Sequence, residues 1–181
     1  MSSESGGAKA NKSGKAFENR VWAEFENIFD RPVYNYSEWD MLTGQSKNAP
    51  KYIKECPFVD KDDAVILAQA PYVGVKTEKR TIRDFIVVNS LGEKTEADMK
   101  NQNVAGSCDE KPEAALLNMW ESDCKRGIVV LSGDYYEKKK ADVRDLKNIA
   151  SKLAATKSGK TLLVFMENEF YDYLENNKEI L

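Results

Sequence analysis

Residues 80–111, RTIRDFIVVNSLGEKTEADMKNQNVAGSCDEK, read as two β-strands joined by a short turn. Side chains of the first strand alternate between two sides, and Asp84 falls on the side of Ile82, Ile86 and Val88. An ionised carboxylate among aliphatic side chains is costly unless it is hydrogen-bonded, paired or bound to a cation. Asp84 therefore requires a partner.

The second strand supplies that partner. It places four polar side chains on one side: Glu96, Asp98, Lys100 and Gln102. If the two strands pair, Asp84 and Asp98 converge, with Lys100 one step further along. Two carboxylates beside an ammonium group favour a site for Mg²⁺ and a polarised water molecule.

This pattern resembles the signature of the PD-(D/E)XK nuclease superfamily, which appears here as Asp84, a spacer and then Asp98-Met99-Lys100. The following residues resemble the stretch after the catalytic lysine in many type II restriction endonucleases: Gln102, Gly106-Ser107 and Asp109-Glu110-Lys111. The chain differs from the pattern at Arg83, where the family often has proline.

The resemblance implies a catalytic site with a cofactor. Asp84 and Asp98 would bind Mg²⁺, for which Mn²⁺ would substitute, and the Met99 carbonyl would be a third ligand. Lys100 would orient the attacking water or help to deprotonate it, and Gln102 would position Lys100 or a phosphate. As in the family, cleavage would leave a 3′-hydroxyl and a 5′-phosphate.

The first helix is predicted over residues 15–29, with Ser13 or Gly14 as N-cap. Glu18 falls inside its apolar arc. In one interpretation Glu18 snorkels or pairs with a lysine at the edge of the core. In the other it reaches the metal site, as the glutamate of the N-terminal helix does in many of the resembled nucleases. The GKAFE sequence of residues 14–18 also resembles the first motif of the family, so we interpret Glu18 as supporting a second cation or the water network.

The sequence contains no histidine. This absence excludes Ser-His-Asp and Cys-His catalysis and His-ligated zinc. The three cysteines are widely spaced and form no C-x-x-C pair, which argues against a zinc site. Any hydrolysis must therefore depend on carboxylates, lysine and a metal ion.

The formal net charge of −3 does not by itself favour a nucleic-acid partner, although a local basic surface can still bind DNA. Four basic residues surround the turn before the first motif strand: Lys76, Lys79, Arg80 and Arg83. They either follow a DNA backbone or protect a sheet edge from aggregation. Ser107 and Lys111 belong to a turn of the type that presents amides to a phosphate, and Lys111 is either a DNA contact or a solvated cap residue.

The element order predicts an α/β fold with a mixed central β-sheet flanked by helices. Strands are expected at residues 72–77, 127–135 and 161–166, and helices at 112–126, 138–156 and 168–176. An apolar segment at 64–70 is interpreted as broken near Pro71. This order resembles the αβββαβ core of restriction endonucleases. Residues 1–13 are predicted to be a disordered tail, and residues 14–181 a single domain with an irregular insertion at 31–63.

The sequence as a whole favours a cytoplasmic, Mg²⁺-dependent endodeoxyribonuclease that cuts double-stranded DNA as a homodimer, in the manner of a sequence-specific type II restriction enzyme. No segment is long and apolar enough to cross a membrane. Two alternatives stay open. One is a phage or mobile-element nuclease that repairs DNA or resolves junctions, and the other is a non-catalytic nucleic-acid-binding module of the same fold.

Overall fold

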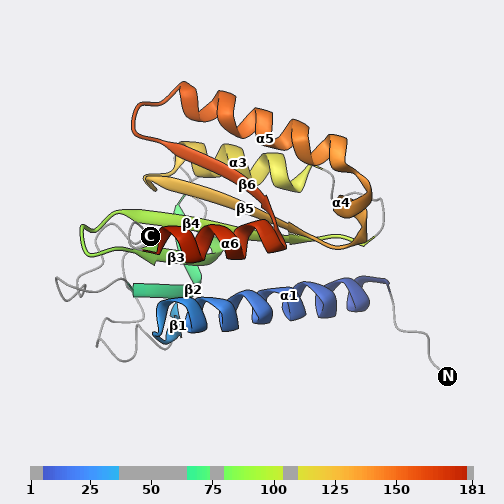
Figure 1. The fold of residues 1–181 in the computed structure, drawn as a ribbon, viewed down its shortest axis with the longest axis horizontal. Coiled ribbons are helices and arrows are strands. Elements are labelled where there is room, and N and C mark those ends of the chain that lie inside the picture. Colours follow the sequence, from blue (N-terminus) through green and yellow to red (C-terminus); the bar gives the residue numbers. More distant parts are fainter. Residues whose placement is uncertain (1–5, 37–64, 74–79, 104–109, 179–181) are drawn as a thin grey trace.

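A computed structural model of the chain describes residues 6–36, 65–73, 80–103 and 110–178, apart from the side chains of residues 6–12, 71–73 and 80–81. In it, a six-stranded mixed β-sheet packs between helices (Figure 1). The predicted fold class is confirmed. Apart from one short extra strand after the first helix, the order of the elements follows the αβββαβ succession expected from the sequence.

The strands lie side by side in the order in which they occur along the chain. They are β1 (Val33–Asn35), β2 (Val65–Val73), β3 (Arg80–Val88), β4 (Lys94–Asn101), β5 (Arg126–Ser132) and β6 (Thr161–Met166). The β2, β3 and β4 strands form an antiparallel meander, whereas β4, β5 and β6 are parallel. The carboxyl ends of β4, β5 and β6 therefore meet at one edge of the sheet.

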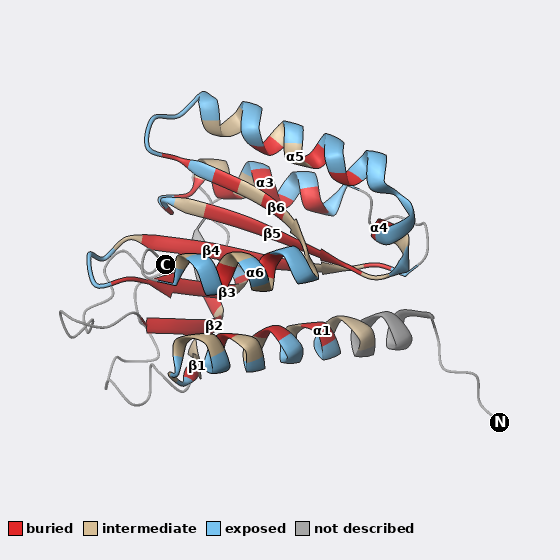
Figure 2. Cartoon of the chain, viewed as in Figure 1, coloured by how far each residue is buried: buried red, intermediate tan, exposed pale blue. Residues whose placement is uncertain are grey.

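Helices cover both faces of the sheet. On one face, α1 (Gly6–Phe29) and α6 (Glu167–Asn177) pack against the strands through buried phenylalanines such as Phe17, Phe25 and Phe170. On the other face lie α3 (Lys111–Glu121), the short α4 (Asp134–Lys138) and α5 (Lys140–Ala155). Figure 2 shows the central strands β3, β4 and β5 mostly buried, the edge strand β6 only partly buried, and the outer sides of α5 and α1 exposed. Within the described ranges, no helix is both long and apolar enough to span a membrane.

The first helix differs from the prediction. It begins at Gly6 rather than near Lys15, so the predicted start of this helix is wrong. Disorder of the N-terminal tail stays a prediction. Most of the predicted insertion, residues 37–63, lies outside the described residues, and the part that is described contains β1. Most of the later helices and strands begin and end within a few residues of the predicted bounds, and β6 matches them. The exceptions are α3, which ends at Glu121 and not at residue 126, and α4, which begins at Asp134 where the sequence predicted the end of a strand.

The β2 strand runs through Pro71, where the sequence predicted a break. Proline cannot donate to a strand ladder and is therefore tolerated where one side of the strand is unpaired. Among the described residues this condition holds, because β1 pairs only with Ile66, Leu67 and Ala68, while Pro71 pairs on its other side with Ile82 of β3. The expected strand at residues 72–77 therefore begins earlier, at Val65, and its residues 74–77 lie outside the described part of the chain.

Gly133 connects β5 to α4 at the carboxyl edge of the sheet. Its φ is 100°, and a Cβ at this position would lie 2.4 Å from the carbonyl oxygen of Gln102. Only glycine fits both the backbone conformation and the close approach. The ends of β4 and β5 are thus locked together beside the motif residues.

We expect Gly133→Ala to lower the free energy of unfolding by about 2–4 kcal/mol, because it combines a strained φ with a steric clash. Gly159→Ala is the matched control, since φ at Gly159 is 75° but a Cβ added there would meet no atom within 4 Å. It should cost only about 1 kcal/mol. Urea denaturation of both variants measures the difference, and equal losses would contradict the assigned contact.

Candidate active site

The sheet is interrupted on both sides of Asp84. Pairing between β3 and β4 covers Phe85 to Val88 against Lys94 to Ala97, while β4 continues to pair with β5 as far as Asn101. On the other side, Ala68 pairs with Phe85 and Ala70 with Arg83, but the ladder skips Gln69 and Asp84. Gln69 has a φ of 53°, in the left-handed region. The strands therefore part at the position of the first motif acid.

The Asp84 side chain occupies this interruption. Its Oδ2 accepts a 2.6 Å hydrogen bond from the backbone N–H of Met99, where a regular ladder would use a carbonyl of β3. The Asp84 and Asp98 side chains are also hydrogen-bonded to each other. The expected convergence of the two acids is present.

Two cations surround Asp98. The Lys100 ammonium lies 2.6 Å from Oδ1, and the Arg83 guanidinium donates to Oδ2 at 3.3 Å. Arg83 also donates to Glu96 at 3.0 Å, and both of these side chains are 2% exposed. A continuous buried network thus joins Glu96, Arg83, Asp98 and Lys100.

The two acids have opposite protonation preferences. Burial, followed by repulsion from Asp98 and the hydrogen bond to it, raises the pKa of Asp84 to about 8. Burial also disfavours the charged form of Asp98. There, however, the charge of Lys100, the hydrogen bond from Asp84 and the charge of Arg83 outweigh it and hold the pKa of Asp98 below its ordinary value. At neutral pH the pair therefore carries one proton, on Asp84.

A pocket of about 280 Å³ opens beside this pair. Asp84, Met99, Lys100 and Gln102 line it together with residues from three helices: Gly14, Glu18, Lys111 and Tyr136. Asn101 completes the lining, and its side-chain amide donates to the Ser13 carbonyl at 2.9 Å, which ties β4 to α1. The structure thus brings together most of the residues that the sequence singled out.

Glu18 reaches this pocket from α1. Its Oε2 accepts a 3.3 Å hydrogen bond from the Gln69 amide. Burial raises the pKa of Glu18, as does the charge of Asp98, while Lys100 and Lys15 lower it. Of the two interpretations made from the sequence, the position of Glu18 favours the one that brings it to the site.

Gln102 is buried and hydrogen-bonded to the helix side of the pocket. Its Oε1 accepts from the Tyr136 hydroxyl at 3.3 Å, and its backbone N–H and C=O bond Ser132 and Tyr135. These contacts orient Gln102 through α4. Its expected role, to position Lys100 or a phosphate, stays a prediction.

The prediction that Arg83 lies on a basic, DNA-facing edge is wrong. Regular alternation would place Arg83 beside Phe85 and Val87, which pack toward α1. The interruption at Asp84 changes this direction, and the guanidinium turns to Glu96 and Asp98 instead. Arg83 is therefore a buried partner of a motif acid.

The other predicted DNA contacts are mostly not described. Lys76, Lys79 and Ser107 lie outside the described residues, as does the side chain of Arg80. Lys111 is described: it is exposed at the first position of α3 and lines the pocket.

The donor set suits a divalent cation with few protein ligands. Asp84 lines the pocket together with Met99, and Asp98, which is hydrogen-bonded to Asp84, supplies a second carboxylate beside it. Mg²⁺ is commonly held by one or two carboxylates and keeps several waters, which an open pocket of this kind allows. In the described part of the chain no cluster of three Asp, Glu, Cys or His side chains is suited to a metal ion. Glu18 is therefore not a third carboxylate of the same cluster, and its expected role as a direct ligand lacks support.

Sequence reasoning missed Tyr136, Gln69 and the true position of Arg83. A signal existed for Gln69, which is the one polar residue in the apolar run at 65–70. Nothing in the local pattern marks Tyr136, because its place in the pocket depends on how α4 follows β5.

No protein-family model matches the sequence, and no curated protein matches it either. The assignment of the site therefore depends on its residues and geometry alone.

We expect Asp84→Asn to change how stability depends on pH when no divalent cation is present. Between the ordinary pKa of 3.8 and about 8, the folded wild-type protein binds one more proton than the unfolded chain. Its free energy of unfolding should therefore fall as pH rises through this window, by at most about 1.4 kcal/mol per pH unit, and level off above it. Asparagine reproduces the neutral acid, since its amide both accepts from Met99 and donates to Asp98, and it does not titrate.

Urea denaturation in EDTA at a series of pH values measures this effect. The variant should become increasingly stable relative to wild type from about pH 5 to about pH 8, as ionisation of Asp84 destabilises only the wild type. Asp172→Asn, on the exposed side of α6, is the control and should parallel the wild type. Parallel curves for Asp84→Asn would contradict the raised pKa.

We expect Arg83→Met to cost about 3–5 kcal/mol of stability, because it leaves two buried carboxylates without their guanidinium partner. The double variant Arg83→Met/Glu96→Gln should recover much of this loss, since it removes the unpaired charge. Arg144→Met, on a side chain that is 73% exposed, serves as control and should change stability little. Chemical denaturation of the four proteins tests the pairing, and an Arg83 variant as stable as the control would exclude it.

Proposed function

We propose that the chain is a Mg²⁺-dependent endonuclease that hydrolyses phosphodiester bonds of double-stranded DNA. One observation carries the proposal: Asp84 lines an open pocket and is hydrogen-bonded to the buried Asp98 beside it, and the Lys100 ammonium lies 2.6 Å from Asp98. Two carboxylates and an amine at this spacing are the components of metal-assisted phosphodiester hydrolysis. The resemblance of the motif to PD-(D/E)XK nucleases supports the same reaction.

Asp84, Asp98 and the Met99 carbonyl would hold the cation. When bound, Mg²⁺ supplies Lewis-acid stabilisation of the scissile phosphate and lowers the pKa of a coordinated water. The network around Asp98 suits this role, because Arg83 and Lys100 keep Asp98 ionised and ready to bind a cation. Asp84 must lose its proton to become the second ligand.

Lys100 is the residue best placed to act on the nucleophile. Its ammonium contacts Asp98 and faces the pocket, so it can hold a water molecule or balance charge that develops on the phosphate. Glu18 lies across the same pocket and would order water or a second cation. Gln102, fixed by Tyr136, would position the phosphate.

The expected substrate class and assembly follow from size. A chain of 181 residues can cover little more than one side of a duplex. Cutting both strands would then require two copies related by a two-fold axis, as in a type II restriction enzyme. The proposal accordingly includes a homodimer on double-stranded DNA.

One observation favours a second candidate, a non-catalytic nucleic-acid-binding module. Both oxygens of Asp98 already contact cations, Lys100 at Oδ1 and Arg83 at Oδ2. A site that is fully paired without metal could be a structural ion-pair network. Titration calorimetry with Mn²⁺ separates the two candidates, because only the nuclease needs a metal-binding pocket.

We expect Asp84→Asn, Asp98→Asn and Lys100→Met each to reduce cleavage of supercoiled plasmid in Mg²⁺ by roughly a hundredfold or more, since each removes a ligand or the amine that acts in the transition state. The two asparagine variants should also lose Mn²⁺ binding in calorimetry. Asp172→Asn is the control and should cleave like the wild type. Near-wild-type cleavage by any of the three variants would exclude this mechanism.

Sequencing the DNA ends produced from a plasmid and from a four-way junction shows whether the cuts are sequence-specific or directed to branched DNA.

A further inference from the structure

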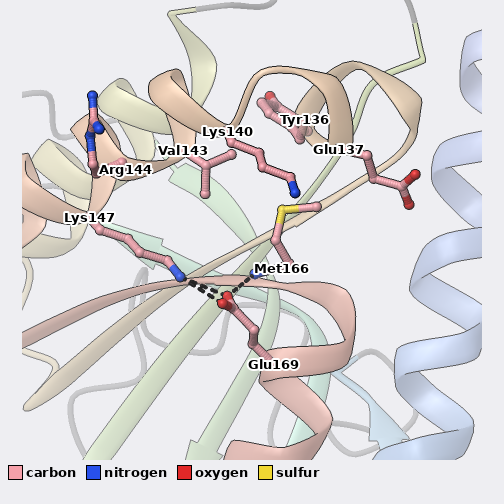
Figure 3. A pocket seen from close by; sticks show the side chains of 8 residues that line it. All are labelled: Tyr136, Glu137, Lys140, Val143, Arg144, Lys147, Met166 and Glu169. Atoms are coloured by element: carbon pink, nitrogen blue, oxygen red, sulfur yellow. Dashed lines mark hydrogen bonds and ion pairs between the residues drawn. The ribbon is translucent and has the colours of Figure 1, made fainter.

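A larger pocket, of about 690 Å³, lies next to the edge strand β6. Its walls come from α4, α5, the end of β6 and the start of α6 (Figure 3). The lining residues are Tyr136, Glu137, Lys140, Val143, Arg144, Lys147, Met166 and Glu169. We call this pocket the α5 groove.

The basic and the acidic side chains of α5 lie on different sides of the helix. Lys140, Arg144 and Lys147 line the groove. Asp142 and Asp145 line a different, acidic pocket on another side of the same helix. Helical periodicity gives positions 140, 144 and 147 one face. A chain with an overall negative charge thus presents a row of cations along one wall of a groove.

Two of these cations are available to a ligand. Lys147 is held by Glu169 at 2.8 and 2.9 Å, which also neutralises one of the two groove carboxylates. Glu137 lies at the far end of the groove from Arg144 and Lys147 (Figure 3). Arg144 lies 3.9 Å from the Asp145 carboxylate, and both side chains are largely exposed, so this contact is weak. In Figure 3 the Lys140 side chain extends from α5 toward Met166.

The groove adjoins the candidate active site through Tyr136. This buried side chain lines both pockets, and its hydroxyl donates to Gln102 of the active site. Both pockets lie where parallel strands end, β4 for the active site and β6 for the groove. Ligands of open α/β sheets bind at this edge.

We propose that the α5 groove binds the phosphate backbone of the DNA whose cleavage is proposed above, on which this inference rests. Lys140 and Arg144 are four residues apart, about 6 Å along a helix, and a DNA strand presents roughly two phosphates over that rise. A small anion would need donors that converge on one point, whereas these cations are spaced along a line. The groove therefore fits a polyanion that continues past Tyr136 into the active site.

The test compares DNA binding by two variants with equal charge change. Lys140→Glu/Arg144→Glu alters the groove, whereas Lys152→Glu/Lys178→Glu alters exposed lysines outside it. Fluorescence anisotropy with a labelled duplex, in Ca²⁺ to prevent turnover and over a range of salt concentrations, gives affinity and its salt dependence. Circular dichroism and thermal melting check that both variants are folded.

We expect the groove variant to bind the duplex at least about tenfold more weakly than wild type, with a salt slope reduced by about 2, because two phosphate contacts are lost. The control should stay within about threefold, since distant exposed charges are screened. Equal losses in both variants, or none in the groove variant, would overturn the inference.

Failure of the groove and failure of the proposed nuclease are distinguishable. A wild-type protein that cleaves plasmid in Mg²⁺, with a groove variant that binds like wild type, overturns the groove and leaves the nuclease standing. A wild-type protein that binds duplex through the groove but never cleaves it supports the groove and overturns the nuclease. A wild-type protein that neither binds nor cleaves DNA overturns both.

Discussion

The pairing of two buried carboxylates, Asp84 and Asp98, is the constraint on which the site depends. Two like charges at this depth cannot both be ionised without a cation between them, so the pair retains one proton in the absence of metal. The neutral Asp84 then accepts from Met99, and this bond replaces a regular β3–β4 backbone bond. The opening of the sheet and the protonation of the acids therefore have one cause. A site held in this way is destabilised as pH rises, unless a divalent cation takes the place of the proton.

The cations on the other side of Asp98 act on position more than on stability. A buried network such as Glu96–Arg83–Asp98 pays for desolvation of each ion, and hydrophobic residues of the same volume would often be as stable. The network instead fixes the orientation of the Asp98 side chain. With Arg83 on one oxygen and Lys100 on the other, the Asp98 carboxylate has a single orientation. An acid with a fixed orientation and a lowered pKa, beside an amine, is the arrangement that the proposed metal-assisted hydrolysis would need, and exposed residues would not hold it in one orientation.

Much of this arrangement is encoded locally, and so the sequence could predict it. Alternation along two neighbouring strands is enough to bring Asp84, Asp98 and Lys100 together, and helical periodicity is enough to direct Glu18 inward. The prediction for Arg83 was wrong because it assumed that alternation continues without a break. The break involves Gln69 on β2, whose left-handed backbone is unusual for a residue that is not glycine, asparagine or aspartate. No property of β3 alone could reveal it. Tyr136 was missed for a similar reason, since its place depends on the tertiary path from β5 into α4.

The lysines at residues 138–140 show a second reason why the sequence alone could not predict part of the site. As a run in the sequence they are typical of a solvated helix end, and composition gives no reason to prefer another interpretation. The fold changes their meaning, because three consecutive parallel strands bring the start of α5 to the same edge as the end of β4. Residues forty positions apart, Lys100 and Lys140, thus border two pockets that share the Tyr136 side chain. The positive charge of Lys140 predicts nothing from its place in the sequence. It supports DNA binding only because the fold places it beside the candidate active site, since a DNA substrate would extend beyond the phosphodiester bond that is cut. In the proposed function, the parallel half of the sheet would therefore decide where the DNA lies, while the antiparallel half supplies Asp84.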